Sequence, residues 1–502
     1  CSSDLIIKEN AQEKGVAIAF DSRHMSPEFA KETALCMAAN GIKAYIFPSL
    51  RPTPMLSFAL RELGCTAGVV VTASHNPPQY NGYKVYWEDG AQITAPKDKQ
   101  IITEVQAITD FAQVKTMSEE DAKAAGLYEV IGEEIDDKYM EALKKLVLRP
   151  EAIKEQADKL KIVYTPLHGT GNIPVRRVLK ELGFNNVYVV KEQELPDGDF
   201  PTVSYPNPED KKAFTLALKL AAEVDADIVL ATDPDADRLG IYAKNEKTGE
   251  YESFTGNMSG MLILEYLLSQ RKELGILPEN GAVVTTIVSG KMARAIAKEY
   301  NVALIETLTG FKYIGEQIKF FEQNHDHEFL FGYEESYGCL EGTHARDKDA
   351  VVAVMALCEA TAYYKSKGIT LCEQMEKLYQ KYGFYKESLF FQTFPGAEGK
   401  AKIDGLMDAL RNQPPKQVGP FKVTALEDYK KSVRTDIATG ETSALTLPES
   451  NVLYFELEDG AWFCVRPSGT EPKIKYYAGV KGTDAQDAAD KLEALSKAVV
   501  EL

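Results

Sequence analysis

The sequence predicts an α/β protein in which three similar α/β domains, with mixed and mostly parallel sheets, precede a C-terminal α+β domain. Two observations lead to this prediction. Short apolar segments alternate with amphipathic ones, and the alternation starts anew twice along the chain. The last part instead has strand-like segments in succession before one closing helix.

The first domain shows the alternation most clearly. Strands are expected at residues 15–20, 43–47 and 68–72. Helices are expected at residues 27–40 and 54–63, the first with Ser26 as its N-cap.

The later domains repeat the pattern before it changes. We expect strands at 161–165, 186–190 and 227–231, then at 282–287, 302–306 and 328–331, with helices beginning at Ile173 and Lys291. In the last part we expect strands at 421–424, 452–456, 462–465 and 474–477 and a helix over 485–500. We place the domains at residues 1–149, 150–256, 257–384 and 385–502.

Composition narrows the class of protein. The chain has 502 residues, too many for one core, and a formal charge of −18 disfavours nucleic acid and anionic membranes as partners. Its 7 cysteines are scattered and never form a CxxC pair, which argues against a disulfide framework or a zinc site and favours the cytoplasm. We see no signal peptide and no apolar run of membrane-spanning length.

Three predicted strands end in polar loops, at residues 72–77, 232–238 and 332–336. In open α/β sheets, ligands bind beyond the carboxyl ends of the strands. Each α/β domain therefore presents one loop where chemistry is expected.

The loop Asp233-Pro-Asp235-Ala-Asp237-Arg238 has carboxylates at alternate positions. Such oxygen ligands suit magnesium or calcium, although a solvated acidic turn is the alternative. An EF-hand is excluded, because Arg238 and Lys244 stand where it needs Gly and Glu. Arg238 favours a site for a cation together with a phosphate.

The loop Thr72-Ala-Ser74-His75-Asn76-Pro77 offers a nucleophile or phosphate carrier at Ser74, with an ordinary polar loop as the alternative. Lys84 follows closely and is a candidate proton donor or acceptor.

Gly332-Tyr-Glu334-Glu335-Ser336 offers acids and a hydroxyl that suit sugar hydroxyls, and the segment 344–349 adds positive charge. A solvated acidic loop is the alternative.

The segment Arg466-Pro-Ser468-Gly469-Thr470-Glu-Pro-Lys473 resembles a phosphate cradle, because backbone N–H groups and hydroxyls can converge there on an anion. The alternative is a simple turn between strands. His168-Gly-Thr-Gly171 is a weaker signal, to which we assign a structural role.

In this order, the four loops resemble those of the α-D-phosphohexomutase superfamily over nearly the whole chain. The resemblance implies four domains around a central cleft. It implies that Ser74 carries the phosphate, that Asp233, Asp235, Asp237 and the Ser74 phosphate bind Mg²⁺, and that Lys84 transfers protons with His75, Arg238 and Lys348 nearby. It further implies sugar contacts from Glu334, Ser336, Thr309 and Gly310, and a cradle for the non-reacting phosphate formed by Arg466, Ser468, Gly469, Thr470 and Lys473.

The resemblance also implies a mechanism of two phosphoryl transfers through a sugar bisphosphate, with a sugar 1,6-bisphosphate as activator. The Gly-Tyr-Glu-Glu-Ser loop and residues 308–313 are similar to the branch of phosphoglucomutases and phosphopentomutases. We therefore expect interconversion of glucose 1-phosphate and glucose 6-phosphate in the cytoplasm by a monomer or homodimer. Pentose and mannose phosphates are alternative substrates.

One departure concerns the first residues. The superfamily usually opens with a Gly-Thr-x-Gly-x-Arg segment, and nothing before Gly15 matches it. Since the sequence begins with Cys1, we expect that it starts at an internal point. A metal-dependent sugar phosphatase and a non-catalytic sugar-phosphate sensor are the rival functions, but neither needs all four loops intact.

Overall fold

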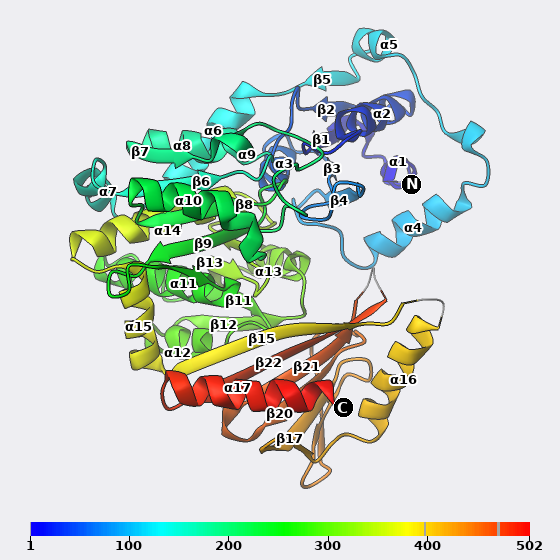
Figure 1. Cartoon of the computed structure of the whole chain (residues 1–502). Coiled ribbons are helices and arrows are strands. Elements are labelled where there is room, and N and C mark those ends of the chain that lie inside the picture. Colours follow the sequence, from blue (N-terminus) through cyan, green and yellow to red (C-terminus); the bar gives the residue numbers. More distant parts are fainter. Residues whose placement is uncertain (1, 396–397, 469–471) are drawn as a thin grey trace. The chain divides into compact units, whose positions relative to one another are not determined.

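The computed structural model describes residues 2–395, 398–468 and 472–502 (Figure 1). The chain divides into two compact units. The first holds the chain up to Thr285, Tyr300–Ile305 and Gly310–Gln374; the second holds Thr286–Glu299, Glu306–Thr309 and the chain from Met375.

The first sheet has the order β4-β3-β1-β2-β5, parallel except for the β3–β4 pair. Its strands are β1 (Val16–Phe20), β2 (Ala44–Ile46), β3 (Ala67–Val71), β4 (Tyr83–Trp87) and β5 (Tyr128–Val130). The accompanying helices are α1 (Ser2–Lys8), α2 (Ser26–Ala39), α3 (Thr53–Glu62), α4 (Lys97–Ala107), α5 (Glu119–Ala124) and α6 (Glu133–Lys144). Strands β1 and β3 are buried throughout, which explains their unbroken apolar runs.

The second sheet has the order β10-β9-β8-β6-β7, in which β6 is parallel to β7 and β8 while the β8–β9 and β9–β10 pairs are antiparallel. Its strands are β6 (Lys161–Thr165), β7 (Asn186–Val189), β8 (Ile228–Thr232), β9 (Leu239–Lys244) and β10 (Tyr251–Phe254). The helices are α7 (Pro150–Gln156), α8 (Asn172–Leu182), α9 (Lys191–Glu194) and α10 (Thr215–Val224).

The third sheet has the order β12-β11-β13-β14. Its strands are β11 (Gly281–Thr286), β12 (Ala303–Thr307), β13 (Glu328–Tyr333) and β14 (Cys339–Glu341). The helices are α11 (Gly256–Glu273), α12 (Met292–Glu299), α13 (Phe311–Asn324), α14 (Ala350–Ser366) and α15 (Leu371–Tyr382). Helix α14 is buried over most of its length and is accordingly apolar on all sides.

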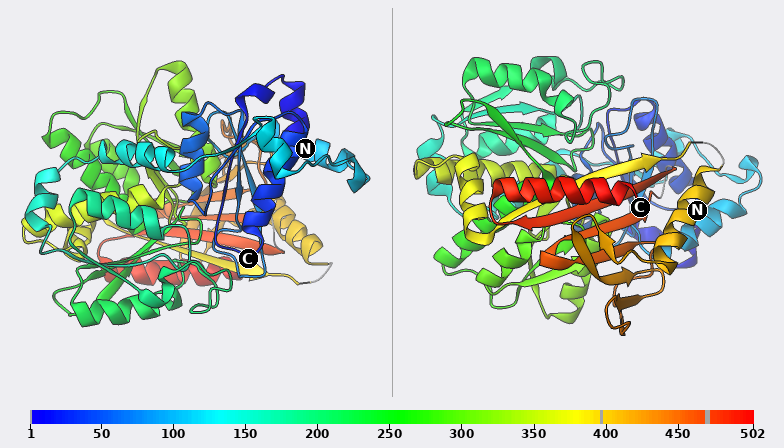
Figure 2. Two further views of the ribbon diagram at one scale, coloured as in Figure 1. Left: turned by 90° about the horizontal axis from the view of Figure 1, so that it is seen from above. Right: turned by 60° about the horizontal axis from the view of Figure 1, so that its bottom comes forward.

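The fourth sheet is antiparallel, with the order β15-β22-β21-β20-β17-β18-β19 and β16 beside β17. Its strands are β15 (Phe384–Thr393), β16 (Gln417–Val418), β17 (Phe421–Asp428), β18 (Val433–Asp436), β19 (Thr442–Ala444), β20 (Leu453–Leu457), β21 (Trp462–Pro467) and β22 (Lys473–Gly482). Helices α16 (Gly399–Asn412) and α17 (Ala485–Val500) share its apolar core (Figures 1 and 2).

The predicted fold class of three α/β sheets followed by an α+β part is confirmed. The strand and helix predictions agree with the structure to within a few residues at most ends, and α17 spans the predicted residues 485–500. The prediction of Ser26 as an N-cap was wrong. Met25 takes the cap position with a φ of 64°, and the Ser26 hydroxyl donates instead to Asp21 Oδ1 at 2.8 Å.

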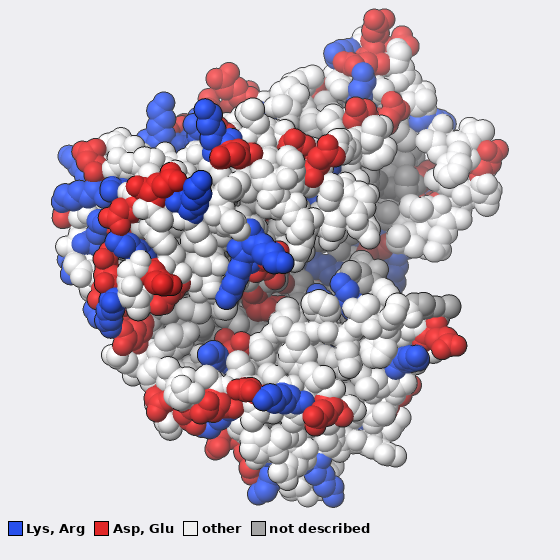
Figure 3. Space-filling view, in the orientation of Figure 1, with Lys and Arg blue, Asp and Glu red and all other residues white. Residues whose placement is uncertain are grey.

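Three further observations concern the surface charges, the helices and the cysteines. Acidic and basic side chains are interspersed over the face shown in Figure 3. In the part of the chain that the structure describes, no helix is both long and apolar enough to cross a membrane. The six described cysteines are free thiols.

A buried carboxyl group at the end of β14 should make the stability of the fold depend on pH. Glu341 is 2% exposed, and its nearest cation is Arg271, with 3.8 Å between Nη2 and Oε1. Burial, with a further contribution from Glu359, raises the pKa of Glu341 to about 8. The folded protein therefore holds a proton here that the unfolded chain releases near its ordinary pKa.

We expect Glu341→Gln to stabilise the protein relative to wild type as pH rises. The stabilisation from a raised pKa is complete below the unfolded pKa and is lost as pH rises through the folded pKa. Between pH 6 and pH 9 the advantage of the variant should grow by about 2 kcal/mol. Chemical denaturation at both pH values measures it, with Glu120→Gln, an exposed position, as the control. A difference that does not change with pH would contradict the buried-acid interpretation.

Candidate functional site

Ser74 lies in the turn after β3, in the loop that the sequence singled out. Its φ is 52°, a left-handed conformation that costs a non-glycine residue free energy. The Ser74 N–H donates to Thr72 Oγ1 at 2.8 Å. The Ser74 hydroxyl donates to Asp233 Oδ2 at 2.8 Å and lies 3.2 Å from His75 Nδ1. The nucleophile predicted from one domain therefore meets the acidic loop predicted from the next.

The acidic loop follows β8 and brings its three carboxylates together. Asp233, Asp235 and Asp237 each offer an oxygen within 4.8 Å of the others, and all are at most 1% exposed. The N–H groups of Asp237 and Arg238 donate to Asp233 Oδ1. Asp235 Oδ1 and Asp237 Oδ1 are buried without a hydrogen-bond partner. Buried anionic oxygens with unused lone pairs fit a hard divalent cation.

Two lysines face this cluster. Lys84 Nζ is 2.6 Å from Asp235 Oδ2 and 3.0 Å from Asp237 Oδ2, and Lys348 Nζ is 3.3 Å from Asp237 Oδ2. Burial would lower the pKa of Lys84, but Asp235 and Asp237 raise it well above its ordinary value. Although burial opposes ionisation, Lys348, Lys84 and Arg238 hold the pKa of Asp237 below its usual range.

The pKa of Asp233 shifts in the opposite direction from that of Asp237. Burial, together with Asp237 and Asp235, raises its pKa well above the ordinary value. A bound cation would relieve this repulsion among the three carboxylates.

The third loop packs against the second. Leu239 N–H, just after the acidic loop, donates to Tyr337 O at 3.0 Å. Glu334 is 4% exposed, and its Oε1 accepts a hydrogen bond from Gly310 N–H at 2.8 Å. Burial raises the pKa of Glu334, with Lys348 and Arg238 opposing it. Ser336 is half-buried in the following turn.

The remaining predicted positions belong to the second unit. Thr309 lies there, as do Arg466 and Ser468 at the end of β21 and Lys473 at the start of β22. The Ser468 N–H donates to Lys473 O at 2.8 Å. Gly469 and Thr470 lie outside the described residues.

Three residues that were not predicted from the sequence also support the site. Thr53 donates from Oγ1 to Asp235 Oδ2 at 2.7 Å, and from its N–H to Asp235 O at 2.9 Å. Tyr86 donates its hydroxyl to Asp347 Oδ2 at 2.7 Å. Arg23 donates to backbone carbonyls of the Ser74 loop. Of these residues, only Arg23 could have been predicted from the sequence, because the polar segment Asp21-Ser-Arg23 also follows the end of a strand.

The Gly-rich turn at residues 168–171 packs against the acidic loop. Thr170 N–H donates to Pro234 O at 2.8 Å. A Cβ on Gly169 would lie 2.4 Å from Pro234 Cα, which explains the glycine.

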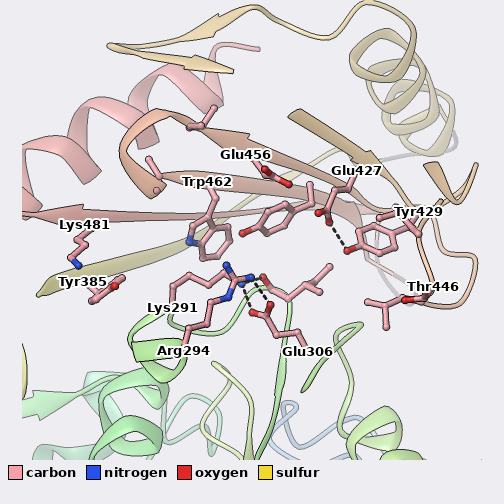
Figure 4. Close-up of a pocket in the computed structure, with 17 residues that line it drawn as sticks. Lys291, Arg294, Glu306, Tyr385, Glu427, Tyr429, Thr446, Glu456, Trp462 and Lys481 are labelled. Carbon is pink, nitrogen blue, oxygen red and sulfur yellow. Dashed lines mark hydrogen bonds and ion pairs between the residues drawn. The ribbon is translucent and has the colours of Figure 1, made fainter. Parts of the chain in front are cut away.

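A separate cavity of about 470 Å³ lies within the second unit (Figure 4). Lys291 Nζ lies over the rings of Tyr454 and Trp462, at 5.4 and 5.2 Å from their centroids. Lys291 and Arg294 both contact Glu306. Because the residues that line the cavity lie outside the four predicted loops, we assign it no part in the candidate site.

Comparison with known proteins gives four matches to family models. They are the α/β/α domains I, II and III of phosphoglucomutase/phosphomannomutase, at residues 4–111, 137–248 and 255–382, and the C-terminal domain at residues 413–495.

Curated relatives match nearly the whole chain. A phosphoglucomutase of Staphylococcus epidermidis is 40% identical over 93% of this chain and 83% of its own length. A phosphoglucomutase of Staphylococcus aureus is 37% identical over 96% of this chain and 84% of its own length.

Two solved structures share the fold. They are a putative phosphomannomutase of Thermus thermophilus, with a TM-score of 0.71 at 21% identity, and a phosphoglucomutase (parafusin) of Paramecium, with a TM-score of 0.72 at 19% identity. Both matches cover 100% of this chain, and they cover 92% and 89% of the solved chains respectively.

Proposed function

Because the chain belongs to the phosphoglucomutase/phosphomannomutase family, as its four loops indicated, we propose that it interconverts glucose 1-phosphate and glucose 6-phosphate. The observation that carries the proposal is the contact between Ser74 Oγ and the buried Asp233–Asp237 cluster. That contact puts a potential phosphate carrier beside a potential cation site.

Ser74 is the proposed carrier. Its phosphate passes to the free hydroxyl of a sugar monophosphate, giving a sugar bisphosphate, and Ser74 then accepts the other phosphate. Lys84 and Lys348 flank the reacting group as cations that stabilise developing charge, and Lys84 is the proposed proton-transfer residue. His75 and Arg238 complete this group.

Asp233, Asp235 and Asp237 are the proposed holders of Mg²⁺, together with the Ser74 phosphate. The orphaned carboxylate oxygens support this assignment. When bound, the ion would neutralise charge on the transferring phosphoryl group. The carboxylates themselves orient the site, since Asp233 accepts hydrogen bonds from Ser74 Oγ and from the Arg238 N–H.

Substrate recognition is assigned to the remaining predicted residues. Glu334, Ser336, Thr309 and Gly310 would contact the sugar, and Arg466, Ser468, Gly469, Thr470 and Lys473 would hold the non-reacting phosphate. We also propose glucose 1,6-bisphosphate as activator, a cytoplasmic location, a monomer or homodimer, and the four domain bounds given above.

The sugar contact at Glu334 can be tested directly. We expect Glu334→Gln to lower kcat/KM for glucose 1-phosphate roughly 100-fold, because a buried acceptor of a sugar hydroxyl loses its charge. Steady-state kinetics with glucose and ribose 1-phosphates measure the effect for each sugar. Glu335→Gln in the same loop is the control and should stay within about threefold of wild type. Equal losses in both variants would contradict the assignment to Glu334.

The proposed function is tested by conversion of glucose 1-phosphate in the presence of Mg²⁺ and catalytic glucose 1,6-bisphosphate. Ribose 1-phosphate and mannose 1-phosphate are assayed in parallel. Fast turnover of glucose phosphate supports the proposal, and faster turnover of ribose or mannose phosphate would reassign the substrate. Release of inorganic phosphate without isomerisation would favour a phosphatase instead.

A further inference from the structure

Arg23 lies three residues beyond the end of β1 and is 1% exposed. Its guanidinium donates to four backbone carbonyls of one loop. Nη1 donates to Pro77 O and Tyr80 O, each at 2.9 Å, and Nη2 donates to Ser74 O at 2.6 Å and to Asn76 O. One buried side chain therefore contacts the loop that carries Ser74 at four points between residues 74 and 80.

Asp21 closes the same network from the other side. Its Oδ2 lies 3.2 Å from Arg23 Nε and accepts the Thr72 hydroxyl at 2.7 Å. Thr72 Oγ1 in turn accepts the Ser74 N–H. Both backbone polar groups of Ser74 are therefore fixed. Its N–H is held through Thr72 and Asp21, and its carbonyl is held by Arg23.

This support matters because Ser74 is held at a φ of 52°. A conformation of this kind persists only when surrounding groups fix it. Arginine suits the task, because its planar fork offers five donors in fixed directions, whereas lysine offers a single point charge. Without the guanidinium, several inward-facing carbonyls would lose their donors.

We propose that Arg23 is a positioning residue for phosphoryl transfer, which holds the loop so that Ser74 Oγ stays beside Asp233. The inference rests on the proposed function, since it concerns how the same serine is presented. Arg23 hydrogen-bonds the loop backbone rather than the reacting atoms, so its replacement acts through Ser74.

The test compares Arg23→Lys with a matched control, Arg51→Lys. Arg51 is a second arginine of the first domain, with a side chain that is 15% exposed and makes a two-point contact to Asp136 at 2.9 and 2.8 Å. For Arg23→Lys we expect kcat to fall about 100-fold with KM within threefold of wild type, because the loop is misplaced while substrate contacts remain. Arg51→Lys should keep its kcat within about threefold.

A second readout separates positioning from general destabilisation. Transfer of labelled phosphate from glucose 1,6-bisphosphate to Ser74, followed by rapid quench, should slow in Arg23→Lys by about the same factor as kcat. If Arg23→Lys fails to fold, Thr72→Val replaces it, because that change removes only the hydroxyl between Asp21 and the Ser74 N–H.

Wild-type kcat and labelling rate in a folded Arg23→Lys or Thr72→Val protein would overturn the inference. Equal losses in Arg23→Lys and Arg51→Lys would overturn it as well. A wild-type protein without mutase activity would instead refute the proposed function, so the two failures are distinguishable.

Discussion

Ser74→Ala should abolish isomerisation, with a loss of kcat on the order of 10⁴-fold or more, because in the proposed mechanism Ser74 carries the phosphate between the two transfers. The fold should survive, since the hydrogen-bond partners of the Ser74 hydroxyl among the described residues are Asp233 and His75. Conversion of glucose 1-phosphate and incorporation of labelled phosphate into the protein measure the two consequences.

The control for this prediction is Ser118→Ala. Ser118 caps α5, where its Oγ accepts the Asp121 N–H at 3.1 Å, so the substitution removes a serine hydroxyl outside the candidate site. Its turnover should match wild type. If Ser74→Ala kept substantial turnover, or if the labelled phosphate stayed on the protein, the phosphoserine mechanism would be wrong.

Much of this site could be predicted because its chemistry is local in sequence. Each reactive loop directly follows a buried strand, at β3, β8 and β13, and the polar residues stand out against apolar runs. The alternating aspartates indicated their own function, since three adjacent acids need a cation or neighbouring bases. The structure supplies Lys84 and Lys348 as those bases.

The residues that the sequence did not reveal are those whose partners are distant in the chain. Thr53 contacts Asp235 across 182 positions, and Tyr86 contacts Asp347 across 261. Neither pair has a local pattern, because the contact exists only once two sheets are placed together. The failed N-cap has a different cause, because its partner is near in the chain: the Ser26 hydroxyl donates to Asp21, which belongs to the support of the Ser74 loop.

Asp235→Asn should weaken the binding of Mg²⁺ more than any substitution outside the cluster. The change keeps the shape of the side chain but removes one charge, and it leaves a neutral amide where Oδ1 has no hydrogen-bond partner. Loss of a residue that only hydrogen-bonds a metal ligand typically lowers metal affinity about 10- to 100-fold, and loss of a direct ligand should lower it more. We therefore expect the Mg²⁺ concentration for half-maximal rate to rise roughly 100-fold or more.

Three measurements on Asp235→Asn distinguish loss of the metal from loss of structure. The rate is titrated with Mg²⁺, binding of Mg²⁺ is followed by calorimetry, and Tm is recorded with and without the ion. Wild type should gain stability with Mg²⁺, because a ligand of the folded state raises Tm, and the variant should lose that gain. Asp199→Asn, which removes an exposed carboxylate paired with His24, is the control and should behave as wild type. An unchanged Mg²⁺ titration in Asp235→Asn would exclude this carboxylate as a ligand. The three-aspartate assignment would then be wrong, whatever the activity of the protein.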